Sequence, residues 1–203
     1  GGFNAEYGDK MSSVLDVTYK KPKSFESSVS MSLLGASAYL GTSSGKFTQI
    51  HGVRYKTSAY LLGSLDTDGE YNPDFIDYQG FFTWQLNPKT ELTVLANFAQ
   101  NSFRFVPQSR STSFGTYNMG RDLTVYFEGQ EKDLFQTAFS AATLTYKPGK
   151  NIQLGFTVSG FHSNENETYD ILGEYILSEV KMDLNEEDRK GAVLGIGKYH
   201  EHA

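Results

Sequence analysis

Apolar and polar residues alternate along most of the chain, and this pattern predicts β-strands. In a strand, successive side chains point to opposite faces, so a period of two produces one apolar and one polar face. The pattern recurs in residues 25–33, 75–86, 91–98 and 151–161. The last of these segments shows it most clearly, with Ile152, Leu154, Phe156 and Val158 alternating with Gln153, Gly155, Thr157 and Ser159.

The whole chain contains seven strand candidates and predicts an all-β antiparallel meander. The candidates are residues 25–33, 36–42, 46–63, 75–86, 91–104, 134–146 and 151–163. The connections between them differ in length. Short polar turns with Gly or Pro are expected at 41–46, 87–90 and 147–150, and long loops at 66–74, 105–133 and 164–203.

Short and long connections alternate, apart from a first tight turn near residues 34–36. Every second connection of a meander lies at the same end, so the short turns should gather at one end and the long loops at the other. Two architectures have this asymmetry. One is an outer-membrane β-barrel with short periplasmic turns, and the other is a soluble β-sandwich with binding loops at one end.

Two details favour the barrel. Trp84 and Tyr146 lie beside short turns, where an aromatic girdle would place them. The residues opposite the apolar ones are Asn, Gln, Thr and Ser more often than charged residues, as a water-filled lumen would require. Seven antiparallel strands would leave two open edges, whereas a closed bacterial barrel pairs an even number. If this chain belongs to a membrane barrel, it therefore forms part of one.

The composition agrees with an all-β protein and excludes several kinds of function. Aromatic residues make up 14% of the 203 residues and glycine occurs 20 times, which favours strands and turns over helices. A net charge of −6 argues against binding to a nucleic-acid backbone. The absence of cysteine excludes disulfides, zinc–thiolate sites and a thiol nucleophile. No stretch approaches the roughly 20 apolar residues of a transmembrane helix.

The first 22 residues, GGFNAEYGDKMSSVLDVTYKKP, resemble the end of the plug domain of TonB-dependent outer-membrane receptors. Residues 25–62, 108–116 and 167–177 also resemble that family, in particular the large receptors with a carboxypeptidase-regulatory-like N-terminal extension. The positions that match the plug-end motif are Gly2, Phe3, Ala5, Tyr7, Gly8, Ser13, Val14, Asp16, Lys20, Lys21 and Pro22.

The resemblance implies a fold and a function. Residues 1–22 would be the C-terminal end of a plug domain, and residues 23–203 the first strands of a large plugged transmembrane β-barrel. Such a receptor imports a bulky nutrient by energy-coupled transport across the outer membrane. Its partners would be outer-membrane lipid, the nutrient ligand and TonB, which contacts a segment upstream of Gly1. The sequence does not show whether a surface lipoprotein also covers the barrel. The receptor is not an enzyme, has no cofactor and binds no nucleic acid. The alternative is a soluble, secreted β-sandwich that binds carbohydrate at its long-loop end.

The expected loop at 103–133 is rich in aromatic residues and arginine, a composition typical of recognition surfaces. These side chains could contact sugars or peptides, or they could pack the loop onto its neighbours. The ligand-binding candidates are Phe103, Arg104, Arg110, Tyr117, Arg121 and Tyr126.

The acidic segment 66–74 presents Asp66, Asp68 and Asp74, whose oxygens could bind Ca²⁺. The spacing lacks the third ligand and the distal Glu of an EF-hand, so a solvated surface loop is the simpler interpretation. His200 and His202 would point to one face if they lay on a strand, but two ligands do not make a metal site, and we expect a loop there. No catalytic residues are predicted.

Overall fold

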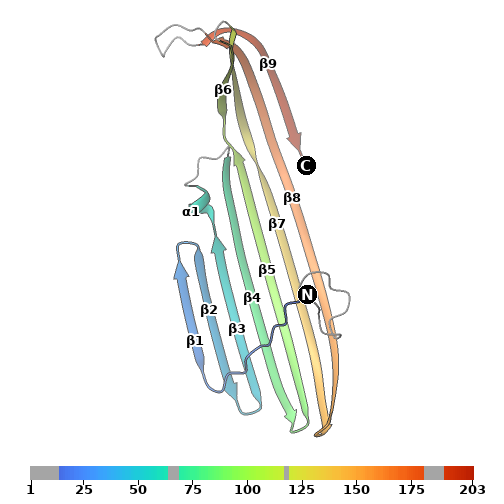
Figure 1. Cartoon of the computed structure of the whole chain (residues 1–203). Coiled ribbons are helices and arrows are strands. Elements are labelled where there is room, and N and C mark those ends of the chain that lie inside the picture. The colour runs from blue at the N-terminus through green and yellow to red at the C-terminus, as the bar shows by residue number, and fades with distance from the viewer. Residues whose placement is uncertain (1–13, 64–68, 117–118, 181–189) are drawn as a thin grey trace.

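The structure is a computed structural model that describes residues 14–63, 69–116, 119–180 and 190–203. These residues form one antiparallel β-sheet and one short helix (Figure 1). The elements are β1 (Glu26–Ser32), β2 (Gly35–Ser44), β3 (Phe47–Thr57), α1 (Ala59–Leu62), β4 (Gly69–Asn87), β5 (Thr90–Pro107), β6 (Arg110–Thr116), β7 (Met119–Gly149), β8 (Ile152–Val180) and β9 (Lys190–His202).

The strands follow one another across the sheet in the order β1-β2-β3-β4-β5-β7-β8-β9, and β6 pairs with β7. β6 continues the path of β5 along the same edge of β7, because β5 pairs with β7 as far as Glu131 and β6 pairs with Met119 to Val125. β1 and β9 are the outermost strands, and the described sheet does not close on itself (Figure 1). The predicted all-β antiparallel meander is therefore confirmed.

The short turns lie at one end of the sheet, as predicted. The turns between β2 and β3, β4 and β5, and β7 and β8 all lie at the lower end in Figure 1. The β1–β2 turn at residues 33–34 lies toward the opposite end, which agrees with the expected first tight turn.

All three expected long loops are wrong, because most of their residues belong to strands. Of the loop expected at 66–74, residues 69–74 begin β4, and residues 66–68 lie outside the described residues. Residues 105–133 contain the end of β5, all of β6 and the first half of β7, and residues after His162 continue β8 and form β9. β7 has 31 residues and β8 has 29, so each spans roughly 100 Å at about 3.3 Å per residue. The long β7–β8 pair extends far beyond the ends of β1 to β3 (Figure 1).

The third predicted strand, 46–63, is too long at its C-terminal end. β3 ends at Thr57, and the one-turn helix α1 follows. The Thr57 hydroxyl accepts a hydrogen bond from the Ala59 backbone N–H, at 3.3 Å, and donates one to the Pro73 carbonyl. These bonds turn the chain away from the strand direction.

The two faces of the sheet differ in chemistry. Directly opposed residues on paired strands share a face. One row of such partners crosses five strands and consists only of threonine, and we call the face that carries it the polar face. The row is Thr48, Thr83, Thr93, Thr143 and Thr157.

The opposite face, which we call the apolar face, carries two neighbouring rows of large or small apolar residues. The register of β4, β5, β7 and β8 aligns them directly. The rows are Phe82, Val94, Ala142 and Val158, and Trp84, Leu92, Leu144 and Phe156. The facial alternation predicted from the sequence is therefore present across the sheet.

The apolar residues of this face form a band next to the short turns. On β8 the band runs from Ile152 to Gly160, after which His162 and Asn164 occupy the same face. Nine strand residues span about 30 Å, the length of strand that crosses a bilayer core. A chain of amides borders the band: Gln136 donates to Gln100 at 2.8 Å, and Asn164 donates to Gln136 at 3.4 Å. We call these three residues the amide row.

The described residues bury almost no apolar side chain. Ile50 is the one buried hydrophobic residue among them, whereas Phe156 is 69% exposed and Val29 is 73% exposed. No second sheet packs on either face of the described part of the chain. The sandwich alternative requires two packed sheets around a dry core, and the described residues do not form that arrangement.

Candidate functional site

The segment before β1, residues 14–25, lies across the polar face of the sheet (Figure 1). Tyr19 stacks on Phe81 of β4, with ring centroids 4.6 Å apart and an interplanar angle of 12°. Phe81 is on the polar face, because its cross-strand partners Ile50 and Leu95 lie in the row next to the threonine row. We call residues 14–25 the crossing segment.

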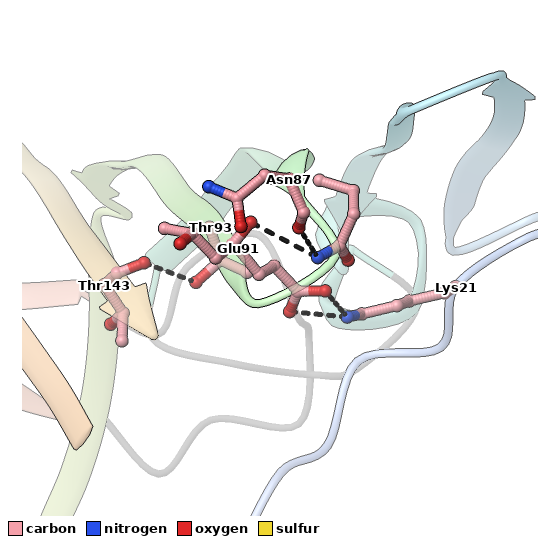
Figure 2. Close-up of polar contacts among 7 residues, drawn as sticks. Lys21, Asn87, Glu91, Thr93 and Thr143 are labelled. Atoms are coloured by element: carbon pink, nitrogen blue, oxygen red, sulfur yellow. Dashed lines mark hydrogen bonds and ion pairs between the residues drawn. The ribbon is translucent and has the colours of Figure 1, made fainter. Parts of the chain in front are cut away.

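Two consecutive lysines fix the crossing segment to strands on either side of β4. The Lys20 Nζ lies 2.7 Å from the Glu26 carboxylate at the start of β1 and 4.4 Å from the centre of the Tyr39 ring on β2. The hydrogen bond to Glu26 raises the pKa of Lys20. The Lys21 Nζ lies 2.7 Å from both carboxylate oxygens of Glu91 on β5 (Figure 2).

The β4–β5 turn holds Glu91 in position. The Gln85 side-chain amide donates to the backbone carbonyls of Asn87, at 2.7 Å, and Thr90, at 3.2 Å. The Asn87 side chain accepts a hydrogen bond from the backbone N–H of Lys89 at 2.9 Å. These contacts close the turn beside Glu91, so its carboxylate faces Lys21 on the polar face (Figure 2).

A cavity of about 380 Å³ lies on the polar face farther from the short turns. Three phenylalanines from β4, β5 and β7 line it, namely Phe75, Phe103 and Phe135, together with Leu61 of α1. The Arg54 guanidinium lies over the Phe75 ring at 5.0 Å, next to this cavity. The lining is mainly apolar, so the cavity suits an apolar or aromatic part of a ligand.

Acidic side chains on the polar face lie beside this cavity. Asp133 is the direct cross-strand partner of both Phe103 and Glu167, and Glu131 is two residues away on the same face. Burial raises the pKa of Glu131, and the neighbouring Asp133 and Glu167 carboxylates raise it further. The Asp133 Oδ1 is buried without a hydrogen-bond partner.

The ligand-binding candidates do not form one surface. Phe103 lines the cavity on the polar face, whereas its neighbour Arg104 projects from the other face and donates to the Gln130 Oε1 at 2.8 Å. Arg121 pairs with Glu179 at 3.4 Å, near the far end of β7. Arg110 lies on β6, opposite Val125 of β7, and Tyr126 is exposed on β7. Tyr117 lies outside the described residues.

The metal candidates are dispersed in the same way. Asp66 and Asp68 lie outside the described residues, and Asp74 accepts a hydrogen bond from the Tyr55 hydroxyl at 2.7 Å. His200 and His202 lie on β9 and not in a loop, with rings 5.2 Å apart, and His200 contacts Asp170 at 2.6 Å. Within the described ranges, no three His, Asp or Glu side chains are grouped as a metal site would require.

Several residues of the site were not predicted. Glu91 and Phe81 contact the crossing segment across large sequence separations, and no local pattern indicates such a contact. Phe75 and Phe135 carried a usable signal, because each is an aromatic residue at a position that the alternation assigns to the polar face.

Comparison of the chain with protein-family models, with curated proteins and with solved structures gave no match. In the part of the chain that the structure describes, no helix is both long enough and apolar enough to cross a membrane.

Proposed function

We propose that this chain forms part of the wall of a TonB-dependent outer-membrane receptor. In this proposal residues 1–22 are the end of the plug domain, and residues 23–203 are the first strands of a large plugged β-barrel. The apolar face contacts outer-membrane lipid, and the polar face lines the lumen. The receptor imports a bulky nutrient without chemical catalysis.

One observation carries this proposal: the crossing segment binds to the polar face while the apolar face stays uncovered. A plugged barrel needs this arrangement, because the chain must pass from the interior to the wall on the lumenal side. Tyr19 and Lys21 make their contacts with Phe81 and Glu91 on that side. Uncovered apolar area on this scale requires a partner, and lipid chains match a band of about nine residues per strand.

The proposed mechanism assigns each face a role. A ligand is captured at the end of the sheet opposite the short turns, where the cavity lined by Phe75, Phe103 and Phe135 opens on the lumenal face. TonB, driven by the inner-membrane proton gradient, pulls on the plug, and a path opens through the lumen. The crossing segment keeps the plug attached to the wall during this step.

The orientation of the two faces can be tested at adjacent residues. The chain contains no cysteine, so single nitroxide labels can be placed through Val158→Cys on the apolar face and Ser159→Cys on the polar face. In bilayer-reconstituted protein, electron paramagnetic resonance should show that the label at 158 is accessible to oxygen and protected from a water-soluble nickel complex. The label at 159 should show the reverse preference. Equal accessibility to the nickel complex at both positions would exclude a lipid-facing band.

The transport role is tested separately in cells. Uptake of the nutrient should require both the receptor and TonB, and it should stop when the proton gradient is collapsed. Uptake that persists without TonB would indicate a passive pore. A soluble monomer in buffer would favour the secreted carbohydrate-binding alternative.

A further inference from the structure

A row of directly opposed residues on the polar face runs from a lysine to a glutamate. Lys56 of β3 opposes Phe75 of β4. Asn101 of β5 lies between Phe75 and Phe135 of β7, as the direct partner of both. Glu165 of β8 opposes Phe135 and ends the row. The first four of these residues line the cavity of about 380 Å³ on the polar face. The cavity therefore has phenylalanine walls, a cation at one side and a carboxylate just beyond the other.

Lys56 provides a positive charge that no carboxylate offsets. It forms no ion pair with a residue that the structure describes. Arg54, two residues away on the same face, pairs with Asp77 at 2.8 Å. Lys56 also lines an adjoining pocket of about 240 Å³, where the hydroxyls of Ser30 and Ser37 can donate hydrogen bonds. This end of the row therefore suits a carboxylate.

The one carboxylate among the residues that line the cavity is directed away from Lys56. Asp74 accepts the Tyr55 hydroxyl at 2.7 Å, and both residues belong by register to the apolar face. Lys56 belongs to the polar face, so the backbone of the sheet lies between the two charges.

The other end of the row carries negative charge that no cation offsets. Glu165 and Glu167 lie on the polar face of β8, and Asp133 of β7 opposes Glu167. None of these three carboxylates forms an ion pair within the described ranges, and the Asp133 Oδ1 is buried without a hydrogen-bond partner. Arg104 and Lys132 lie in the same part of the sheet but belong by register to the apolar face. This end therefore suits an ammonium group.

The distance between the two ends determines the length of a ligand that reaches both. Neighbouring strands lie about 4.8 Å apart, so the four spacings from β3 to β8 put Lys56 and Glu165 roughly 19 Å apart. The two side chains cannot pair with each other over this distance. An ion pair at each end takes about 3 Å, which leaves about 13 Å, the length of four extended peptide residues.

We propose that this row binds a zwitterionic peptide of about four residues with apolar side chains. Its C-terminal carboxylate pairs with Lys56, its N-terminal ammonium pairs with Glu165 and Glu167, and its apolar side chains enter the cavity. Asn101 lies in the middle of the row, where its amide can donate to and accept from a peptide backbone. This inference rests on the proposed function, because it names the nutrient that the cavity captures.

The test measures binding of the peptide Ala-Phe-Phe-Ala to the intact protein in detergent by isothermal titration calorimetry. The native protein should bind the peptide with free termini about three- to ten-fold more tightly than its N-acetylated or its C-amidated form. Ala-Gly-Gly-Ala, which lacks apolar side chains, should bind more weakly than all three. Equal affinity for the free and the blocked peptides would overturn the proposal, because the cavity would then bind an apolar ligand without regard to charge.

Two variants assign each charge of the peptide to its partner. Lys56→Gln should remove the preference over the amidated peptide and keep the preference over the acetylated one. The double variant Glu165→Gln/Glu167→Gln should do the reverse. A variant that weakens the free and both blocked peptides by the same factor would show that its side chains do not contact the termini, and this result would also overturn the proposal.

Matched controls remove the same charges elsewhere. Lys89→Gln lies in the β4–β5 turn, and Glu70→Gln/Glu128→Gln lies on the apolar face. These variants should keep both preferences. A control that loses a preference would show that net charge, and not the row, selects the peptide.

Uptake in cells separates this inference from the proposed function. If the peptides bind as expected but their uptake does not require TonB, the receptor assignment is wrong and the peptide site stands. If TonB-dependent uptake of another nutrient is found and the peptides do not bind, the peptide assignment is wrong and the receptor stands.

Discussion

Lys21 binds both carboxylate oxygens of Glu91 at 2.7 Å, although 70 residues separate them in the sequence. Together with the stack of Tyr19 on Phe81, this contact fixes the crossing segment to the middle of the sheet. An exposed ion pair contributes only about 0–1 kcal/mol, and an aromatic pair adds about 0.5–1.5 kcal/mol. The segment is thus bound by several weak contacts and not by one strong one.

The first prediction concerns the attachment of the crossing segment. The double variant Tyr19→Ala/Glu91→Gln leaves every lysine in place and should detach the segment from the sheet. Its contacts sum to roughly 1–2 kcal/mol, so trypsin cleavage after Lys20 and Lys23 should accelerate about ten-fold in the membrane-inserted protein. Tyr60→Ala is the matched control, because Tyr60 is 70% exposed on α1. Equal cleavage rates for the native protein and the double variant would show that these contacts do not hold the segment.

The second prediction concerns the apolar band. Phe156→Lys places a charge on the apolar face, and Ser159→Lys places one on the polar face of the same strand. A lysine facing the bilayer midplane should cost about 2–4 kcal/mol, whereas one facing a watery lumen should cost little. Denaturant unfolding in bilayers measures the difference in the free energy of unfolding. Equal costs at both positions would argue against a lipid-facing band.

The third prediction concerns the long β7–β8 pair. Gly129 has φ of +102°, and a Cβ there would collide with the Asp170 backbone carbonyl. Gly129→Ala should therefore cost about 1–3 kcal/mol and loosen the upper part of the pair. Gly155→Ala is the control, because nothing lies within 4 Å of its added Cβ. Hydrogen exchange should show faster exchange near residues 121–131 in the first variant alone, and unchanged protection there would contradict the structural role of Gly129.

The fourth prediction concerns pH and Glu131. Burial, with Asp133 and Glu167 nearby, raises the pKa of Glu131 above its ordinary value, so the folded state binds a proton more tightly than the unfolded state does. Stability is therefore lost as pH rises from the ordinary pKa through the raised one. Glu131→Gln should stabilise the protein at neutral pH and have no effect below the ordinary pKa of glutamate. The gain should be small, because water still screens most of this carboxyl.

Unfolding measured at pH 7 and at pH 3.5 checks this prediction. Glu174→Gln is a contrasting control, because Glu174 pairs with Lys198 at 2.8 Å and its replacement removes a favourable contact. A stabilising effect of Glu131→Gln that persists at pH 3.5 would show that charge is not its cause.

The strands near the short turns were predictable because one of their faces is apolar. In β8, Leu154, Phe156 and Val158 alternate with polar residues. This alternation predicts both the strand and which of its side chains lie on the apolar face. From Ser163 to Thr168 both faces are polar, and from Ile171 to Val180 apolar residues occur on both faces, so the alternation that identifies a strand disappears. Backbone pairing with β7 continues there nonetheless, as far as Glu179 opposite Arg121. The sequence therefore predicted the lower half of each long strand and mistook the upper half for a loop.

The site was less predictable than the strands, because it depends on contacts between distant segments. Phe103 is a candidate because it belongs to a segment rich in aromatic residues and arginine, and it does line a cavity. The other phenylalanines of that cavity, Phe75 and Phe135, come from other strands. Arg104 was paired with Phe103 in the prediction, yet adjacent residues of a strand face opposite ways. The strand predicted at 91–104 already contains both residues, and its alternation places them on opposite faces.

The geometry of the crossing segment determines how it would respond to tension. It runs across several strands, and its contacts with β1, β2, β4 and β5 are made by separate side chains in a row along the chain. A force applied at the upstream end would act on these contacts in sequence and not all at once, so each contact would break at a low force. The backbone hydrogen bonds between the strands would remain intact, so the sheet would keep its structure while the crossing segment detaches from it.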